Sequence, residues 1–236
     1  MAKGGTETEP ASTRTVDRAL QLFTSVLDSD VGDSLSELAR STELSPSTAS
    51  RLLATLTKHG LVQRTEEGRY RPGLRMKQLA TAALADDPLY ELTGSHLEHL
   101  VDSTHETASL GVAAGPDQVL YLRQVHSRTH QVQTVVWTGR TIPRLDTALG
   151  AALDGVVDDD GYRISRRADS DVAAVAAPLV GHRGTIPGAI SINAPAYRTA
   201  DEDLHRYGRL LVSHARDISL ELGAPREAMQ RYNLID

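Results

Sequence analysis

Apolar residues recur at helical spacing in the first part of the chain and predict an amphipathic helix over residues 14–27. Gly32 and the polar residues around it end this pattern. The residues expected to face inward share a spacing of three or four positions: Val16, Ala19, Leu20, Phe23 and Leu27. Before the helix, residues 1–13 have no apolar run and are expected to form a disordered tail.

Two further helix starts follow closely. Ser34 with Glu37 three residues later has the form of a capping box, in which each residue satisfies a free backbone N–H group of the other. Ser45 followed by Pro46 is a hydroxyl cap with proline at the first helical position. The third helix ends at Gly60, and its inward positions are Ala49, Leu52, Leu53 and Leu56. Two short helices joined by a tight turn are therefore expected here.

Residues 61–64 and 69–71 are two short strand patterns separated by a loop that contains Gly68, and they predict a small hairpin. Pro72-Gly73 ends the hairpin. Two helices followed by a hairpin are the winged helix-turn-helix arrangement, predicted over residues 14–73. The Ala-rich stretch 74–87 is expected to be a linker helix.

Residues 88–224 mix helix and strand patterns and predict a second domain. Residues 89–100 and 204–222 have helical periodicity, residues 147–153 form a short helix of small residues, and residues 154–171 are polar enough to be a surface loop. The alternating or apolar strand segments are 107–112, 119–125, 132–137, 172–180 and 186–193. Short turns between these strands imply an antiparallel sheet covered by helices, so the fold class is α+β. Residues 225–236 are expected to be a C-terminal tail.

Composition excludes several protein classes. The 236 residues include no cysteine, which excludes disulfides and thiolate zinc sites, and no segment is apolar enough to be a signal peptide or membrane span. A cytoplasmic protein without a cofactor is expected. Only 4% of residues are aromatic, too few for a base-stacking platform. His96 and His99 lie one helical turn apart without an evident third metal ligand.

The segment that contains the third helix and the hairpin is basic within an acidic chain. Residues 45–77 carry seven Lys or Arg and two Glu, whereas the whole chain has a formal net charge of −6. A localised basic segment indicates contact with a polyanion. If the apolar stripe of the third helix packs inward, then Ser47, Thr48, Arg51 and Thr55 face outward, where Arg51 can donate two hydrogen bonds to guanine. Ser45 at the helix start, with Arg64 and Arg69 on the hairpin, is expected to contact the DNA backbone or the minor groove.

Residues 34–76, SLSELARSTELSPSTASRLLATLTKHGLVQRTEEGRYRPGLRM, resemble the DNA-binding region of IclR-family transcriptional regulators. The resemblance continues at LDTALGAAL (145–153) and AVAAPLVGHRGTIPGAISIN (174–193) and covers residues 14–222. It implies a homodimer or homotetramer that binds a pseudo-palindromic operator in double-stranded DNA. It also implies a GAF-like C-terminal domain over residues 88–224 that is built on a six-stranded sheet. This domain would bind a small-molecule effector and mediate oligomerisation. The protein is expected to act as a repressor.

The resemblance also places an effector site on this chain, with the class of effector expected to be an organic acid or an aromatic compound. Backbone N–H groups at the start of the short helix would hold a carboxylate, and the implied contact residues are Ala148, Leu149, Val175, Ser191 and Asn193. The chain departs from the family in two ways. The region before Ala-Ala-Pro has no cysteine, and the interval between Leu153 and Val172 is short. Two alternatives stay open: a C-terminal domain that only oligomerises, and an enzyme built on that domain.

Overall fold

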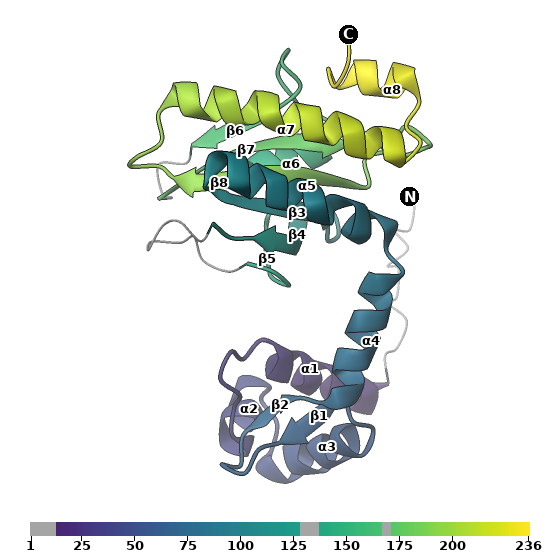
Figure 1. Cartoon of the computed structure of the whole chain (residues 1–236). Helices are drawn as coiled ribbons and strands as arrows, with labels where there is room; N and C mark the ends of the chain where they lie inside the picture. Colours follow the sequence, from purple (N-terminus) through teal and green to yellow (C-terminus); the bar gives the residue numbers. More distant parts are fainter. Residues whose placement is uncertain (1–12, 128–136, 167–170) are drawn as a thin grey trace, which may run out of the picture. The chain divides into compact units, whose positions relative to one another are not determined.

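The computed structural model describes residues 13–127, 137–166 and 171–236. The chain divides into two compact units, Met1–Asp86 and Asp87–Asp236, which are taken separately below (Figure 1). The expected tail at residues 1–13 and the strand expected at 132–137 lie almost wholly outside the described residues. None of the described helices combines the length and the apolar character that a membrane span requires.

The first unit contains the helices and the hairpin that the sequence predicts. They are α1 (Arg14–Leu27), α2 (Leu35–Ser41), α3 (Pro46–Lys58), β1 (Val62–Arg64), β2 (Tyr70–Pro72) and α4 (Leu74–Ala85). The capping box is formed, since Ser34 N–H donates to Glu37 Oε2 at 2.8 Å and Glu37 N–H donates to Ser34 Oγ at 3.3 Å. Strands β1 and β2 pair antiparallel. None of the residues of α4 is buried.

The inward face of α1 differs from the predicted one. Leu22 and Val26 are fully buried, whereas Val16 and Leu20 are 55% and 57% exposed. The sequence of α1 contains two overlapping apolar rows, and α2 and α3 pack against only one of them. The core of this unit joins α1 to the other elements through Leu22, Val26, Leu38, Ala39, Ala49, Leu53, Leu56, Val62 and Tyr70. Val16 and Leu20 therefore form an exposed apolar row on α1.

The second unit is built on a six-stranded antiparallel sheet in the order β5-β4-β3-β8-β7-β6, as the resemblance implies. Its strands are β3 (Thr107–Ala113), β4 (Gln118–Val125), β5 (Thr141–Pro143), β6 (Arg163–Arg166), β7 (Val172–Leu179) and β8 (Gly188–Pro195). Its helices are α5 (Pro88–Thr104), α6 (Ala148–Leu153), α7 (Asp201–Glu221) and α8 (Arg226–Arg231).

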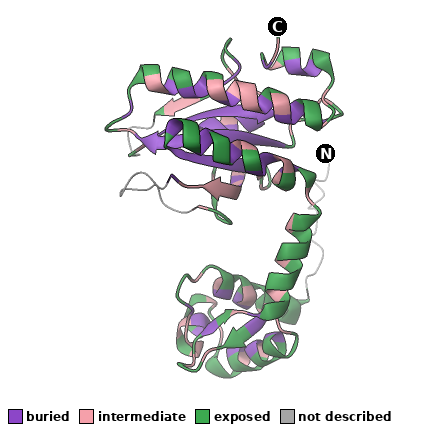
Figure 2. Ribbon diagram, in the orientation of Figure 1, coloured by how far each residue is buried: buried purple, intermediate pink, exposed green. Residues whose placement is uncertain are grey.

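Successive side chains along each central strand belong to two different hydrophobic cores, one on each face of the sheet, because alternate residues of a strand point to opposite faces. Helices α5 and α7 cover one face, where Leu110, Ile190 and Ile192 are buried (Figures 1 and 2). The short helix α6 covers the other face, where Leu149 and Ala152 pack against the sheet. The α6 face is the one that carries buried polar residues.

Two predictions for the second unit are wrong. Residues 154–171 were expected to be a surface loop, yet Tyr162 is buried and residues 163–166 form the edge strand β6. Residues 225–236 were expected to be a tail, yet they contain α8 and bury Met229 and Leu234 in the main core. Both segments are polar on average, and a few large side chains anchor them.

Three histidines meet where α5 packs against α7. His96 Nδ1 lies 2.8 Å from His214 Nδ1, and the ring centre of His99 lies 6.4 Å from that of His214. Glu221 Oε1 is 3.9 Å from His96 Nε2. Burial, with the nearby His96 and His99, lowers the pKa of His214, although Asp217 opposes this. Neutral His214 is therefore favoured in the folded state.

We expect the second unit to lose stability in mild acid. An ordinary histidine titrates near pH 6.5, so below that pH the unfolded chain takes up a proton that folded His214 resists, and the free energy of unfolding falls as the pH falls. Urea unfolding at pH 7.5 and 5.5, followed by the fluorescence of the single Trp137, reports on this unit.

His214→Gln is expected to reduce the acid loss, and His182→Gln, at an exposed turn, is expected to leave it unchanged. An equal acid loss in wild type and His214→Gln would contradict the assignment.

Candidate functional site

One side of α3 is free of the core. Ala49, Leu53 and Leu56 are buried, and the exposed positions recur every three or four residues. Among the exposed positions, those opposite the buried stripe are called here the outer face of α3: Ser47, Ser50, Arg51, Ala54, Thr55 and Lys58. The face carries two cations and no acidic side chain. A helix of this width with a polar cationic face fits the major groove of DNA.

Arg51 is the strongest hydrogen-bond donor on the outer face of α3. Its side chain is exposed, and its guanidinium has neither a hydrogen bond nor an ion pair with any residue that the structure describes. A free guanidinium keeps both N–H edges available for an external acceptor. The predicted outward position of Arg51 is confirmed.

Hydroxyl groups gather at the N-terminus of α3. Ser45 Oγ accepts a hydrogen bond from Thr48 N–H at 3.2 Å and lies 2.8 Å from Thr48 Oγ1 and 3.1 Å from Ser47 Oγ. Thr48 is half-buried, so it supports the helix start more than it faces outward. Hydroxyl and backbone N–H donors at a helix start are suited to phosphate oxygens.

The two predicted hairpin arginines differ. Arg64 is exposed, its Nε donates weakly to Gly68 O at 3.4 Å, and its guanidinium lies 5.7 Å from the ring centre of Tyr70. Arg69 instead donates from Nη1 to Gly32 O at 2.7 Å and lies 3.9 Å from Glu37. The structure thus shows Arg69 fastening the hairpin to the segment before α2 with a side chain that is still 44% exposed, and its expected DNA contact stays a prediction.

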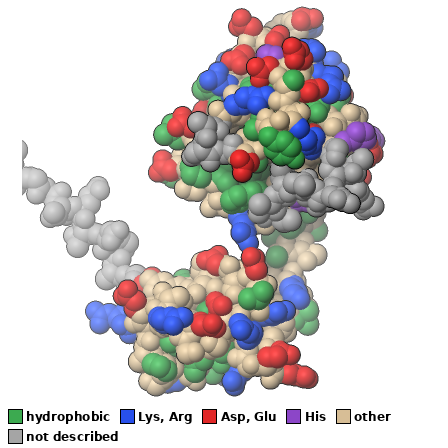
Figure 3. Space-filling view, turned by 90° about the vertical axis from the view of Figure 1, so that its left-hand side faces the viewer, with side chains coloured by type: hydrophobic (Ala, Val, Ile, Leu, Met, Phe, Trp, Pro, Cys, Tyr) green, Lys and Arg blue, Asp and Glu red, His purple; other side chains and the backbone are tan. Residues whose placement is uncertain are grey.

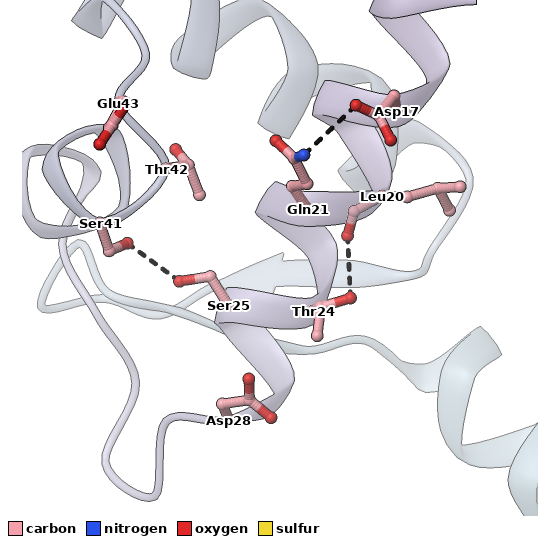
Figure 4. A pocket seen from close by; sticks show the side chains of 9 residues that line it. All are labelled: Asp17, Leu20, Gln21, Thr24, Ser25, Asp28, Ser41, Thr42 and Glu43. Carbon is pink, nitrogen blue, oxygen red and sulfur yellow. Dashed lines mark hydrogen bonds between the residues drawn. The ribbon is translucent and has the colours of Figure 1, made fainter. Parts of the chain in front are cut away.

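A groove between α1 and α2 has the opposite charge. It encloses about 630 Å³, and among its lining side chains Asp17, Asp28 and Glu43 are acidic and none is basic. Hydrogen bonds within its walls include Gln21 Nε2 to Asp17 Oδ2 at 3.3 Å (Figure 4). An acidic groove repels phosphate, so within this unit the outer face of α3 is the surface suited to DNA.

In the second unit, polar side chains are buried on the α6 face of the sheet. Asn193 Nδ2 donates to Ser109 Oγ at 3.2 Å and to Ser191 Oγ at 3.3 Å, and Gln124 Nε2 donates to Ser109 Oγ at 3.1 Å. Cross-strand pairing places Gln124, Ser109 and Ser191 in one row. These four residues are called here the polar floor.

The polar floor brings together two predicted residues and two that the sequence analysis missed. Ser191 and Asn193 were expected, whereas Ser109 and Gln124 were not. The signal for Ser109 is its polarity between the apolar Ala108 and Leu110, whereas Gln124 follows Arg123 and has no such signal. Ala148 and Leu149 are buried at the start of α6, over the same face, where Thr147 Oγ1 accepts from Gly150 N–H at 3.1 Å.

Val175 lies on the wrong face for the expected effector contact. It pairs with Ile192, and both side chains are buried in the core under α5 and α7. On the same strand, Ala174 pairs with Asn193 and Ala176 pairs with Ser191. The strand alternation therefore assigns Ala174 and Ala176 to the α6 face and excludes Val175 from it.

His126 lies beside the polar floor. Its Nδ1 is 3.4 Å from Thr107 Oγ1, and Thr107 pairs across strands with Asn193. The enclosed Nε2 has no hydrogen-bond partner among the described residues. Burial lowers the pKa of His126. A neutral imidazole with one unused ring nitrogen is a further polar group next to this floor.

A separate hollow of about 420 Å³ opens beside α6, lined in part by Leu145, Thr147 and Ile164. Each of its three arginines forms an ion pair with an aspartate. The pairs are Arg144–Asp154, Arg163–Asp158 and Arg166–Asp201. Figure 3 shows cationic and anionic side chains similarly interspersed over the surface in view. Because these cations are paired, the hollow has no free guanidinium to attract an anion.

Comparisons with known proteins match each of the two units to a family model. Residues 15–66 match the model of the IclR helix-turn-helix domain, and residues 159–220 match that of the bacterial transcriptional regulator IclR C-terminal domain. HTH-type transcriptional regulator KdgR of Escherichia coli is 25% identical over 226 residues, which cover 80% of this chain and 85% of the relative. The glycerol operon regulatory protein of Streptomyces coelicolor is 29% identical over 237 residues, with 81% and 89% covered.

A solved structure shares the fold. The crystal structure of an IclR homologue from Microbacterium hydrocarbonoxydans, complexed with 4-hydroxybenzoate, matches with a TM-score of 0.71. The two sequences are 17% identical, and the match covers 88% of this chain and 98% of that chain.

Alanine substitutions of Arg69 and Arg51 distinguish an arginine that stabilises the fold from one that is only exposed. Arg69→Ala is expected to lower the free energy of unfolding by about 1 kcal/mol, because Gly32 O loses its donor. Arg51→Ala is expected to change it little, because the guanidinium contacts no described residue. Chemical denaturation of the full chain followed by circular dichroism measures both, and equal losses would contradict the different roles.

Proposed function

Since the chain belongs to the IclR family of transcriptional regulators, we propose that it represses transcription by binding a specific operator through α3. Its relatives are regulators and not enzymes. The observation that carries the proposal is the outer face of α3, where Arg51 is exposed and free. Arg51 donates its two hydrogen bonds to guanine O6 and N7, and Ser45, Ser47 and Arg64 contact the backbone.

The operator is a pseudo-palindrome bound by a homodimer or a pair of dimers. One α3 reads about half of such a site, and a two-fold symmetric pair of helices requires an inverted repeat. The exposed apolar row Val16 and Leu20 on α1 supports self-association of the first unit. Basic residues in the 45–77 segment supply phosphate contacts within an otherwise acidic chain, so the protein binds DNA through this surface. We expect it to act in the cytoplasm.

The second unit senses a small carboxylic acid, with or without an aromatic ring. The polar floor offers side-chain donors and acceptors under α6, and Tyr121 and Trp137 on that face supply aromatic surface with ring centres 6.4 Å apart. N–H groups in the first turn of α6, at Ala148 and Leu149, have no acceptor within the helix. The IclR homologue that holds 4-hydroxybenzoate supports this class of effector.

The operator function is tested by selecting bound sequences from random duplex DNA with the full-length protein. An inverted repeat is expected. Arg51→Ala should weaken binding to the selected duplex by about 1–3 kcal/mol, because one guanine loses its paired donor, and should change binding to unrelated duplex much less. Electrophoretic mobility shifts at several salt concentrations measure both affinities.

Arg216→Ala, which removes one exposed cation from the second unit, is the matched control and should bind like wild type. Equal losses on selected and unrelated duplex in Arg51→Ala would contradict base reading and leave phosphate binding only.

The effector function is tested by thermal unfolding of the full chain with 4-hydroxybenzoate and other small carboxylates. A bound compound raises the unfolding midpoint, because it binds only the folded state. Asn193→Ala should lose most of this rise, because it removes the centre of the polar floor, and Gln230→Ala, at an exposed position of α8, should retain it. If no compound raises the midpoint, the second unit serves oligomerisation alone.

A further inference from the structure

The chemistry of α3 restricts which bases it can read. Residues 46–58 include no Asn, Gln, Asp or Glu. Asn and Gln are the side chains that pair with adenine through two hydrogen bonds, and carboxylates accept from cytosine. On the outer face of α3 the remaining readers are the guanidinium of Arg51, the ammonium group of Lys58, hydroxyl groups, and methyl groups. The face is therefore suited to guanine and to thymine, whose 5-methyl group is the apolar mark in the major groove.

Two methyl groups lie side by side on this face. Ala54 is exposed and has only a methyl group to present. Thr55 is also exposed, and its Oγ1 donates to Arg51 O at 3.1 Å within the helix. Since that bond occupies the hydroxyl proton, the methyl group is the part of Thr55 without a bond to its own helix. Ala54 and Thr55 together form an apolar spot between Arg51 and Lys58.

The spacing along α3 places this spot next to the base that Arg51 contacts. Ala54 and Thr55 follow Arg51 by three and four residues, or one helical turn of about 5.4 Å. Successive bases of one strand are about 3.4 Å apart, so one turn of helix corresponds to one or two base steps.

We propose that the methyl groups of Ala54 and Thr55 read the 5-methyl group of a thymine that lies one or two base pairs from the guanine bound by Arg51, in each half-site. This inference rests on the proposed operator function and adds a specificity determinant to it. Each contact removes from water about one methyl group of the protein and the 5-methyl group of the thymine. A buried methyl group of this kind changes affinity by about fourfold.

The test compares thymine with deoxyuridine, which lacks only the 5-methyl group. In the duplex selected by the full-length protein, each thymine of a half-site is replaced in turn by deoxyuridine, and the dissociation constant is measured. At one or two positions adjacent to the guanine, the wild-type protein is expected to bind the deoxyuridine duplex about fourfold more weakly per half-site than the thymine duplex.

Ala54→Gly and Thr55→Ser each remove one methyl group and are expected to bring the thymine-to-deoxyuridine ratio toward one at their position. The ratio is taken within each variant, so a partial loss of helix stability in Ala54→Gly affects both duplexes and cancels. Thr24→Ser is the matched control. Thr24 is exposed on α1, and its Oγ1 donates to Leu20 O at 3.0 Å in the same geometry.

The outcomes separate the two proposals. If a site is selected and deoxyuridine binds as tightly as thymine at every position, or if the preference persists in Ala54→Gly and Thr55→Ser, then methyl reading is wrong while operator binding stands. If no sequence is enriched, both are overturned. A selected site whose guanine has no thymine within two base pairs also overturns the inference.

Discussion

The burial of one side of α3 is the constraint on which DNA recognition depends. Ala49 and Leu53 pack into the same core as Leu22 and Val26 of α1, and this packing prevents α3 from rotating about its axis. With the helix held, Arg51 and its neighbours face outward whatever partner is present. The caps at Ser34 and Ser45 set where α2 and α3 begin, and hence the phase of each helix.

The hairpin shows how the same kind of residue takes different roles through its position. Arg69 and Arg71 donate to carbonyl oxygens of Gly32 and Val31, so these cations hold the hairpin to the rest of the unit. Arg64, on β1, keeps an exposed guanidinium. The basic charge of the segment is thus divided between cations bonded within the unit and cations whose guanidinium is free of such bonds.

In the second unit the alternation of side chains along each strand separates an apolar face of the sheet from a face that carries polar side chains. The side under α5 and α7 is apolar, with Leu110, Ile190 and Ile192 in a continuous core. The side under α6 carries the polar floor, whose hydrogen bonds link β3, β4 and β8. Buried polar groups of this kind must find partners, and the hydrogen bonds among them hold the side chains of the floor in place.

Local patterns in the sequence determined the helix starts, the hairpin, the α+β class and the outward position of Arg51, because caps, glycines and apolar spacing act over a few residues. Tertiary structure alone decided which row of α1 is buried, that Arg69 is bonded internally, that Val175 faces away from α6, and that Ser109 and Gln124 join Asn193. Each of these depends on strand register or on packing between segments far apart in the chain. The local pattern of either segment does not show which distant segment it contacts.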